Sequence, residues 1–176
     1  MKSLFLIILL LGLVVVLRAQ ELPSDDIEDL SGTWFAKAIV CDKNRPDGKK
    51  PKKMFPMKVT ALEGGDLEVT ITFQKDGQCH NKKFVMEKTE EPGKYTLLKS
   101  KKAMYIQKTS VEDHYIIYSE CKHNGKSHRK GKLIARHPKE NPEAMKEFQE
   151  FARSKKFPAE NIFVPEQTNQ CIPESE

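Results

Sequence analysis

The sequence predicts an all-β protein, an eight-stranded up-and-down antiparallel barrel with one C-terminal α-helix packed on its outside. Between Gly32 and His137, apolar and polar residues alternate over short segments that end at turn-forming residues, which is typical of half-buried antiparallel strands. Every connection except the first, from Asp42 to Phe55, is short enough for a hairpin. Helical periodicity appears only afterwards. Eight strands in such a meander can close, which removes both sheet edges and leaves room for packed side chains or one small ligand.

The N-terminus carries a targeting signal. Residues 4–17 form an almost unbroken apolar stretch of 14 residues, preceded by Lys2 and followed by Arg18 and Ala19. This stretch is shorter than the roughly 20 residues that a membrane-spanning helix needs. A positive residue before it and a small residue after it are typical of a secretory signal peptide. We therefore expect residues 1–19 to be cleaved, residues 20–176 to form a single secreted domain, and no membrane insertion.

Charge and cysteine content limit the partners. The 176 residues include 30 Lys and Arg against 25 Asp and Glu, and without Lys2 and Arg18 the formal charge falls from +5 to +3. A nucleic-acid-binding domain usually concentrates a larger basic excess, so we expect no nucleic-acid partner. Secretion into an oxidising compartment favours disulfides, and the four cysteines allow three pairings.

The first four strands each carry one apolar face. The first spans Gly32 to Cys41, and Gly64-Gly65-Asp66 and Asp76-Gly77 provide tight connections further along the chain. The residues expected to share the inner face are Trp34, Ala36, Ala38 and Val40 in the first strand, Met57, Val59 and Ala61 in the second, Leu67, Val69, Ile71 and Phe73 in the third, and Phe84 and Met86 in the fourth.

The last four strands are bounded by clear turns. Glu91-Pro92-Gly93-Lys94 turns the chain because Pro fixes φ before a Gly that tolerates positive φ. Asn124-Gly125 is the strongest hairpin signal, and it leads into the eighth strand, Lys126 to His137. The expected inner residues are Tyr95 and Leu97 in the fifth strand, Met104 and Ile106 in the sixth, Tyr115, Ile117 and Ser119 in the seventh, and Ile134 in the eighth.

One amphipathic helix follows the strands. Asn141 is a good N-cap and Pro142 suits the first helical position, while Pro158 is expected to end the helix. Its apolar residues recur at spacings of three and four: Ala144, Met145, Phe148, Phe151 and Ala152. A single apolar stripe needs a surface to cover, and we expect that surface to include the outward residues Phe35 and Ile39 of the first strand.

Three separated features resemble the lipocalin family. Ser31-Gly32-Thr33-Trp34 opens the first strand like the family's Gly-x-Trp element, and Asp113-His114-Tyr115 is similar to its Thr-Asp-Tyr element, with Glu112 in place of the Thr. Arg136 stands where the family places an Arg against the Trp. The resemblance implies structural roles for Gly32, Trp34 and Arg136. A guanidinium on an indole face gains about 0.5 to 2 kcal/mol and closes the barrel end.

The resemblance also implies a disulfide between Cys79 and Cys171, which ties the C-terminal tail to the fourth strand. Cys41 and Cys121 have no such assignment and should lie near the open end of the barrel. We expect two free thiols there, with a second disulfide as the alternative.

Two further stretches, residues 59–65 and 87–95, are similar to the lipocalin subgroup of odorant-binding and tear lipocalins (von Ebner's gland proteins). What this resemblance implies is a secreted, monomeric carrier of small hydrophobic molecules such as odorants, aldehydes, fatty acids or retinoids. Methionines in the expected lining can re-pack around different guests. The predicted ligand-binding residues are Ala36, Ala38, Val40, Met57, Val59, Val69, Ile71, Phe73, Phe84, Met86, Met104, Ile106, Ile117, Ser119 and Lys132.

Lys132 enters this set by strand parity. If Arg136 points inward to cover Trp34, Lys132 lies four residues earlier on the same face. An ammonium among apolar walls should have a lowered pKa, and a ligand carboxylate or carbonyl oxygen would satisfy it. The alternative is a side chain that reaches water at the open end, or a bulge that turns it outward.

No catalytic constellation is present in the sequence. None of the five His has the His-x-x-x-His spacing of a metal site, and no Cys-x-x-Cys pair, Gly-x-Ser-x-Gly elbow, phosphate loop or dinucleotide fingerprint occurs. We therefore expect no enzyme activity, metal or cofactor. The alternative function is a secreted protease-inhibitor-like or cell-surface interaction protein that acts through the loop from Asp42 to Phe55 or the tail. A cell-surface receptor is a further candidate partner.

Overall fold

The structure is a computed structural model that describes residues 29–43, 50, 53–97 and 100–174. The predicted signal peptide, residues 1–19, and most of the connection from Asp42 to Phe55 lie outside the described residues. Among those residues, no helix is long and apolar enough to span a bilayer.

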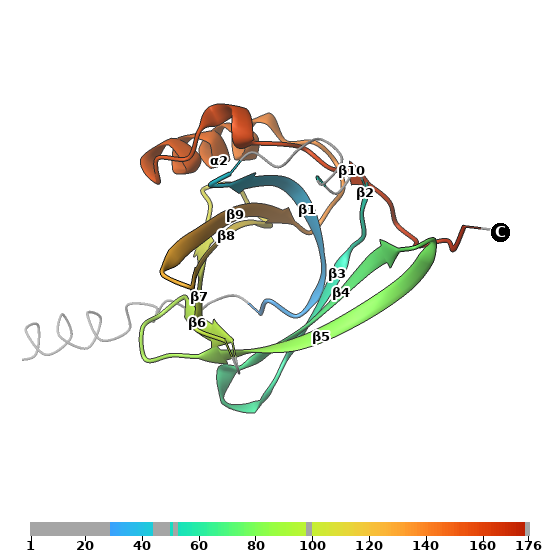
Figure 1. Ribbon diagram of the computed structural model, residues 1–176, viewed down its shortest axis with the longest axis horizontal. Coiled ribbons are helices and arrows are strands. Elements are labelled where there is room, and N and C mark those ends of the chain that lie inside the picture. The colour runs from blue at the N-terminus through green and yellow to red at the C-terminus, as the bar shows by residue number, and fades with distance from the viewer. Residues whose placement is uncertain (1–28, 44–49, 51–52, 98–99, 175–176) are drawn as a thin grey trace, which may run out of the picture.

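Eight strands form a closed antiparallel barrel (Figure 1), as the sequence predicts. Each strand pairs with the next of the set and the last pairs with the first, so the topology is an up-and-down meander without a free edge. The strands are β1 (Gly32–Cys41), β3 (Met57–Ala61), β4 (Leu67–Lys75), β5 (Gln78–Lys88), β6 (Lys94–Leu97), β7 (Lys102–Lys108), β8 (His114–His123) and β9 (Lys126–Ala135). The predicted eighth strand extends two residues too far, to His137.

Two of the predicted hairpin turns have the backbone that their sequences favour. Asn124 and Gly125 have φ values of 49° and 71°, and Asp76 and Gly77 have 53° and 71°. Positive φ at both central residues matches the right-handed twist of the flanking strands. These turns therefore fix the β8–β9 and β4–β5 registers. A short 3-10 helix, η2 (Glu63–Gly65), connects β3 and β4.

The C-terminal segment runs along the barrel and is tied to it at several points. Two short strands that the sequence does not predict, β2 (Lys53–Met54) and β10 (Glu166–Gln167), pair in parallel. Phe163 exchanges two backbone hydrogen bonds with Ile39, after the 3-10 helix η3 (Ala159–Asn161). The disulfide Cys79–Cys171 is present, as the family resemblance implies. It closes a loop with a sequence separation of 92 residues, which the chain-entropy model values at about 4 to 5 kcal/mol.

Helix α2 (Pro142–Ser154) lies on the outside of the barrel over β1 and β9 (Figure 1). The Asn141 side chain accepts a hydrogen bond from the Ala144 N–H at 3.0 Å, so the predicted N-cap is confirmed. The helix ends earlier than Pro158. Lys156 adopts a left-handed φ of 60°, which stops the helix at Ser154 and turns the chain back onto the barrel.

A β-bulge in β1 reverses the expected faces of this strand. Against β9, Ala36 pairs with Ile134, but Ala38 pairs with Leu133, so Lys37 is the extra residue. Cross-strand partners share a face, and Leu133 faces outward toward the helix. Ala38 therefore faces outward as well.

The bulge corrects two expectations about what lies under α2. Ala38 and Val40, predicted to face inward, pack in an outer cluster with Phe148 and Phe151 of the helix. Ile39, predicted to lie beneath the helix, pairs instead with Lys132 on the inner face. The outer cluster is made of Ala38, Val40, Ile116, Tyr118, Leu133, Ala144, Phe148, Phe151, Ala152 and Phe157.

Candidate ligand-binding cavity

Trp34 and Arg136 close one end of the barrel. The Arg136 guanidinium lies 3.8 Å from the centre of the Trp34 ring, and it donates hydrogen bonds to the Ser31 and Asp29 carbonyl oxygens at 2.7 and 2.9 Å. The Trp34 Nε1–H donates to the Leu30 carbonyl oxygen at 2.8 Å. These contacts hold the indole and the guanidinium together, so the two side chains form a floor across this end of the barrel.

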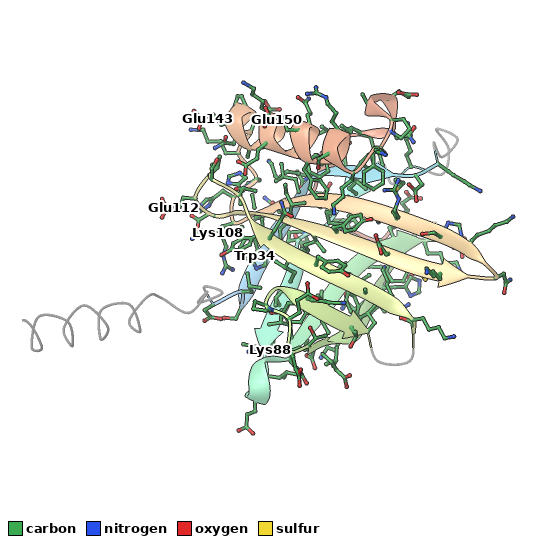
Figure 2. All side chains as sticks on the ribbon, turned by 90° about the vertical axis from the view of Figure 1, so that its left-hand side faces the viewer. Trp34, Lys88, Lys108, Glu112, Glu143 and Glu150 are labelled. Carbon is green, nitrogen blue, oxygen red and sulfur yellow. A yellow bond between two sulfur atoms is a disulfide. The ribbon has the colours of Figure 1, made fainter. Side chains whose placement is uncertain are left out.

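Gly32 is required for this arrangement. Its φ of 111° is unfavourable for other residues, and a Cβ at this position would lie 2.8 Å from the Nη1 atom of Arg136. The glycine of the Gly-x-Trp element therefore makes room for the guanidinium. Figure 2 shows Trp34 toward the barrel end that carries Lys108 and Glu112, while the β8–β9 hairpin extends from the other end.

Above this floor the barrel encloses a cavity of about 510 Å³. Sites for small molecules usually have volumes of about 300 to 1,000 Å³ and mostly apolar walls. The apolar lining residues are Leu30, Trp34, Met57, Val59, Leu67, Val69, Ile71, Phe84, Met86, Leu97, Met104, Ile106, Ile117 and Ile134. The remaining lining residues are Ser100, Ser119, Lys82, Lys102, Lys130 and Lys132.

Most of the predicted site residues lie together in this lining. Strand alternation places Met57, Val59, Val69, Ile71, Phe84, Met86, Met104, Ile106, Ile117, Ser119 and Lys132 around the cavity. Whether they bind a ligand stays a prediction. The expected lining also included Leu67, Leu97, Tyr115 and Ile134. Leu67, Leu97 and Ile134 line the cavity, whereas Tyr115 does not and instead packs edge-on against the Trp34 ring at a centroid distance of 5.4 Å.

Four of the predicted residues do not line it. Ala38 and Val40 face the helix because of the bulge at Lys37. Ala36 is buried opposite Ile134 without contributing to the lining. Phe73 lies beyond the cavity near the end of β4, where its ring stacks on His80 at a centroid distance of 5.4 Å.

The sequence analysis missed several lining residues. Lys82, Lys102 and Lys130 each lie two residues before a predicted lining residue, so continuing the same alternation toward the open end would have found them. Leu30 precedes β1 and carries no strand periodicity, so only the three-dimensional structure identifies it.

Lys132 lies on the cavity wall as parity predicts. The register places it beside Ile117 on one side and Ile39 on the other. Burial, reinforced by the charges of Lys130 and Lys102, lowers the pKa of Lys132 to about 7 from its usual 10.5. At neutral pH this side chain is therefore present both as an ammonium and as a neutral amine.

The two remaining cysteines are unbridged and lie at the open end. Cys41 pairs with Lys130 in the β1–β9 register, and Cys121 pairs with Lys102 and His128. Both are half-buried free thiols, so the second disulfide does not form in this structure. No group of three or more potential metal ligands occurs among the described residues.

Comparisons with known proteins agree on one family. The model of the lipocalin / cytosolic fatty-acid binding protein family matches residues 31–169. The chain is 53% identical to odorant-binding protein 2a of Mus musculus, over 98% of both chains. It is 44% identical to lipocalin-1 of Sus scrofa over 93% of both, and 42% identical to von Ebner gland protein 1 of Rattus norvegicus over 92% of both.

A solved structure shares the fold. The siderocalin Ex-FABP matches with a TM-score of 0.68 at 21% sequence identity, over 82% of this chain and 98% of that one. At this identity the likeness supports the barrel architecture alone.

Proposed function

This chain belongs to the lipocalin family, and from that premise we propose that it is a secreted carrier that reversibly binds small hydrophobic molecules in its barrel cavity. The observation that carries the proposal is the cavity of about 510 Å³ with a predominantly apolar lining. Burying a ligand there gains about 0.8 kcal/mol for each CH₂ group removed from water. Odorants, aldehydes, fatty acids and retinoids have the size and polarity that this cavity suits.

The wall combines flexible and rigid parts. Met57, Met86 and Met104 can change rotamer to fit guests of different shape. Trp34 and Arg136 hold the floor in place through the contacts described above. Such a site favours broad selection by size and apolarity.

Lys132 adds a preference for oxygen-containing heads. No hydrogen bond or ion pair of its ammonium is found among the described residues. A ligand carboxylate would pair with the charged form. The neutral amine can attack an aldehyde carbonyl carbon, and loss of water then leaves a C=N bond that hydrolysis reverses.

Displacement of a fluorescent aminoanthracene probe tests the cavity as the binding site. Met104→Trp fills the cavity with an indole, so we expect at least a tenfold loss of affinity for the probe and for odorants. Gln107→Trp is the matched control, because Gln107 lies on the opposite face of the same strand and is exposed. Equal affinities in the two variants would contradict binding inside the barrel and favour the alternative, a function in the loops or tail.

The same assay tests Lys132. Lys132→Met keeps the apolar stem and removes the amine, so we expect aldehydes and fatty acids to bind at least several-fold more weakly, while a neutral terpene binds as before. Borohydride should trap an aldehyde adduct in the original protein and not in the variant. A variant that weakens all three ligand classes alike would exclude a specific role for the Lys132 amine.

A further inference from the structure

Among the described residues, the cavity lining carries four lysines and no acidic residue. Lys82 comes from β5, Lys102 from β7, and Lys130 and Lys132 from β9. The polar residues that accompany them are Ser100 and Ser119, whose hydroxyl groups can donate hydrogen bonds. The apolar cavity therefore has a strongly cationic section.

The cationic section lies toward the open end. Along β9, Arg136 covers the floor, Ile134 lies next on the inner face, and Lys132 and Lys130 follow at increasing distance from the floor. The register gives the same order on the neighbouring strands, with Ile117 beside Lys132, Ser119 beside Lys130, and Cys121 beside Lys102. On the strands that carry these lysines, the apolar lining residues lie nearer the floor: Phe84 and Met86 on β5, Met104 and Ile106 on β7, and Ile134 on β9.

The lysines approach from different walls. In the closed strand order, β5 and β9 are four strands apart in a barrel of eight, so they lie on opposite sides, and β7 lies midway between them. Figure 1, which looks along the barrel, shows these three strands around the interior. A group at the centre of the mouth would be met by ammonium groups from three sides.

Two of the described acidic residues at this end, Asp42 and Glu120, have other partners. Asp42, which follows β1, accepts two hydrogen bonds from the Arg129 guanidinium at 2.6 and 2.9 Å. Glu120 accepts from the Tyr118 hydroxyl, and that ring packs in the outer cluster. Neither of these carboxylates belongs to the cavity lining.

A ligand head with two negative charges fits this section better than a carboxylate. A phosphate monoester carries a charge of about −1.5 to −2 at neutral pH and offers three acceptor oxygens, whereas a fatty acid carries one charge and two oxygens. Mutual repulsion supports the same conclusion, because Lys130 and Lys102 both lower the pKa of Lys132. A dianion would relieve the repulsion of several ammonium groups at once.

We propose that the cavity selects single-chain amphiphiles with a phosphate monoester head, which lies among Lys82, Lys102, Lys130 and Lys132 while the alkyl chain extends toward Trp34. This inference rests on the proposed function, because the chain must occupy the same apolar cavity. It goes beyond that function by assigning the head chemistry that the open end prefers.

Four ligands with one decyl chain separate the contributions of the head: decyl phosphate, decyl sulfate, decanoate and decan-1-ol. Sulfate and phosphate heads are both tetrahedral, but the sulfate ester carries a single charge. In probe displacement at pH 7.5 and low salt, we expect decyl phosphate to bind at least tenfold more tightly than decyl sulfate and decanoate, and decan-1-ol to bind most weakly. The phosphate advantage should fall as salt is added.

Charge-neutralising variants locate the effect. Lys82→Gln and Lys102→Gln should each reduce the ratio of phosphate to sulfate affinity several-fold and leave decan-1-ol unchanged. Lys83→Gln and Lys101→Gln are matched controls that remove the same net charge from the adjacent residues, both of which are exposed. We expect the ratio of phosphate to sulfate affinity to be unchanged in these controls. An equal reduction of this ratio in variants and controls would overturn the proposed location of the phosphate head.

The remaining outcomes are also decisive. Equal affinity for decyl phosphate and decyl sulfate would overturn the preference for a dianionic head while leaving the carrier function intact. If inorganic phosphate competes with decyl phosphate when both are present at the same concentration, the site binds free phosphate and does not select an amphiphile. If none of the four ligands, including decan-1-ol, displaces the probe, the result would contradict the proposed carrier function itself.

Discussion

The wall formed by β1, β8 and β9 separates two apolar regions that differ in packing. On its outer side, Ile116, Leu133 and Phe148 are at most 1% exposed and belong to the cluster beneath α2. On its inner side, Ile134 is also buried but lines the cavity, and Ile117, which lines it as well, is only partly buried. The same strands thus bound a filled space on one side and an open one on the other.

The difference follows from what each face meets. The helix brings large rings against the outer face, where Phe148 and Phe151 stack at a centroid distance of 6.1 Å. None of the described helices enters the barrel, so the inner side chains of the described strands face those of the opposite wall, and eight strands leave space for a small ligand. Stability should therefore depend on the outer region and affinity on the inner one.

The largest expected effect tests the outer region. Phe148→Ala should lower the free energy of unfolding by about 3 to 5 kcal/mol, because a fully buried ring is lost and a void remains. Denaturant unfolding measures this loss. Probe affinity of the folded fraction should stay within about twofold of the original value. A loss of affinity without a loss of stability would contradict the separation of the two regions.

A smaller effect is expected at Gly131, where the outer cluster leaves no room for a side chain. An added Cβ would lie 2.9 Å from Val40 Cγ1 and 3.1 Å from Phe151 Cε1. Gly131→Ala should therefore lower stability by about 1 to 3 kcal/mol through overpacking, although Ala suits a strand better than Gly. A thermal melt measures the change. An unchanged or higher Tm would mean that the outer region has free space.

The smallest effect concerns Lys132 on the inner side. Its pKa of about 7 lies below the unfolded value of 10.5, so the unfolded state binds more protons between these pH values. The original protein therefore gains stability as pH rises from 7 to 10.5. The free-energy cost of burying the charged Lys132 ammonium is fully present below pH 7. Lys132→Met removes this penalty. We expect the variant to be more stable at pH 7 by on the order of 1 kcal/mol, since water in the open cavity moderates the burial.

Denaturant unfolding at several pH values measures this difference. The advantage of Lys132→Met should shrink as pH approaches 10.5, where the amine is neutral in both states. If the stability difference between the variant and the original protein is the same at every pH, folding does not lower the pKa of Lys132.

Much of the fold could be predicted from local patterns. The turns at Asp76-Gly77 and Asn124-Gly125 and the cap at Asn141 depend on a few neighbouring residues, so the sequence indicates them directly. Strand alternation also placed most of the cavity lining. The same alternation continues toward the open end, where it also places Lys82 and Lys102 on the inner face, although the sequence prediction did not include them.

By itself, the sequence determined the number and order of the barrel strands and the inward parity of Lys132. The tertiary structure alone decided the faces of β1 beyond Lys37. Residues 38–40 are all apolar, so either assignment of faces buries an apolar set, and alternation cannot locate a bulge there. The pairing with β9 makes the choice, because it turns Ala38 and Val40 toward Phe148 and Phe151. The cavity volume has the same origin, since it depends on how opposite walls are spaced and not on the residues of any single strand.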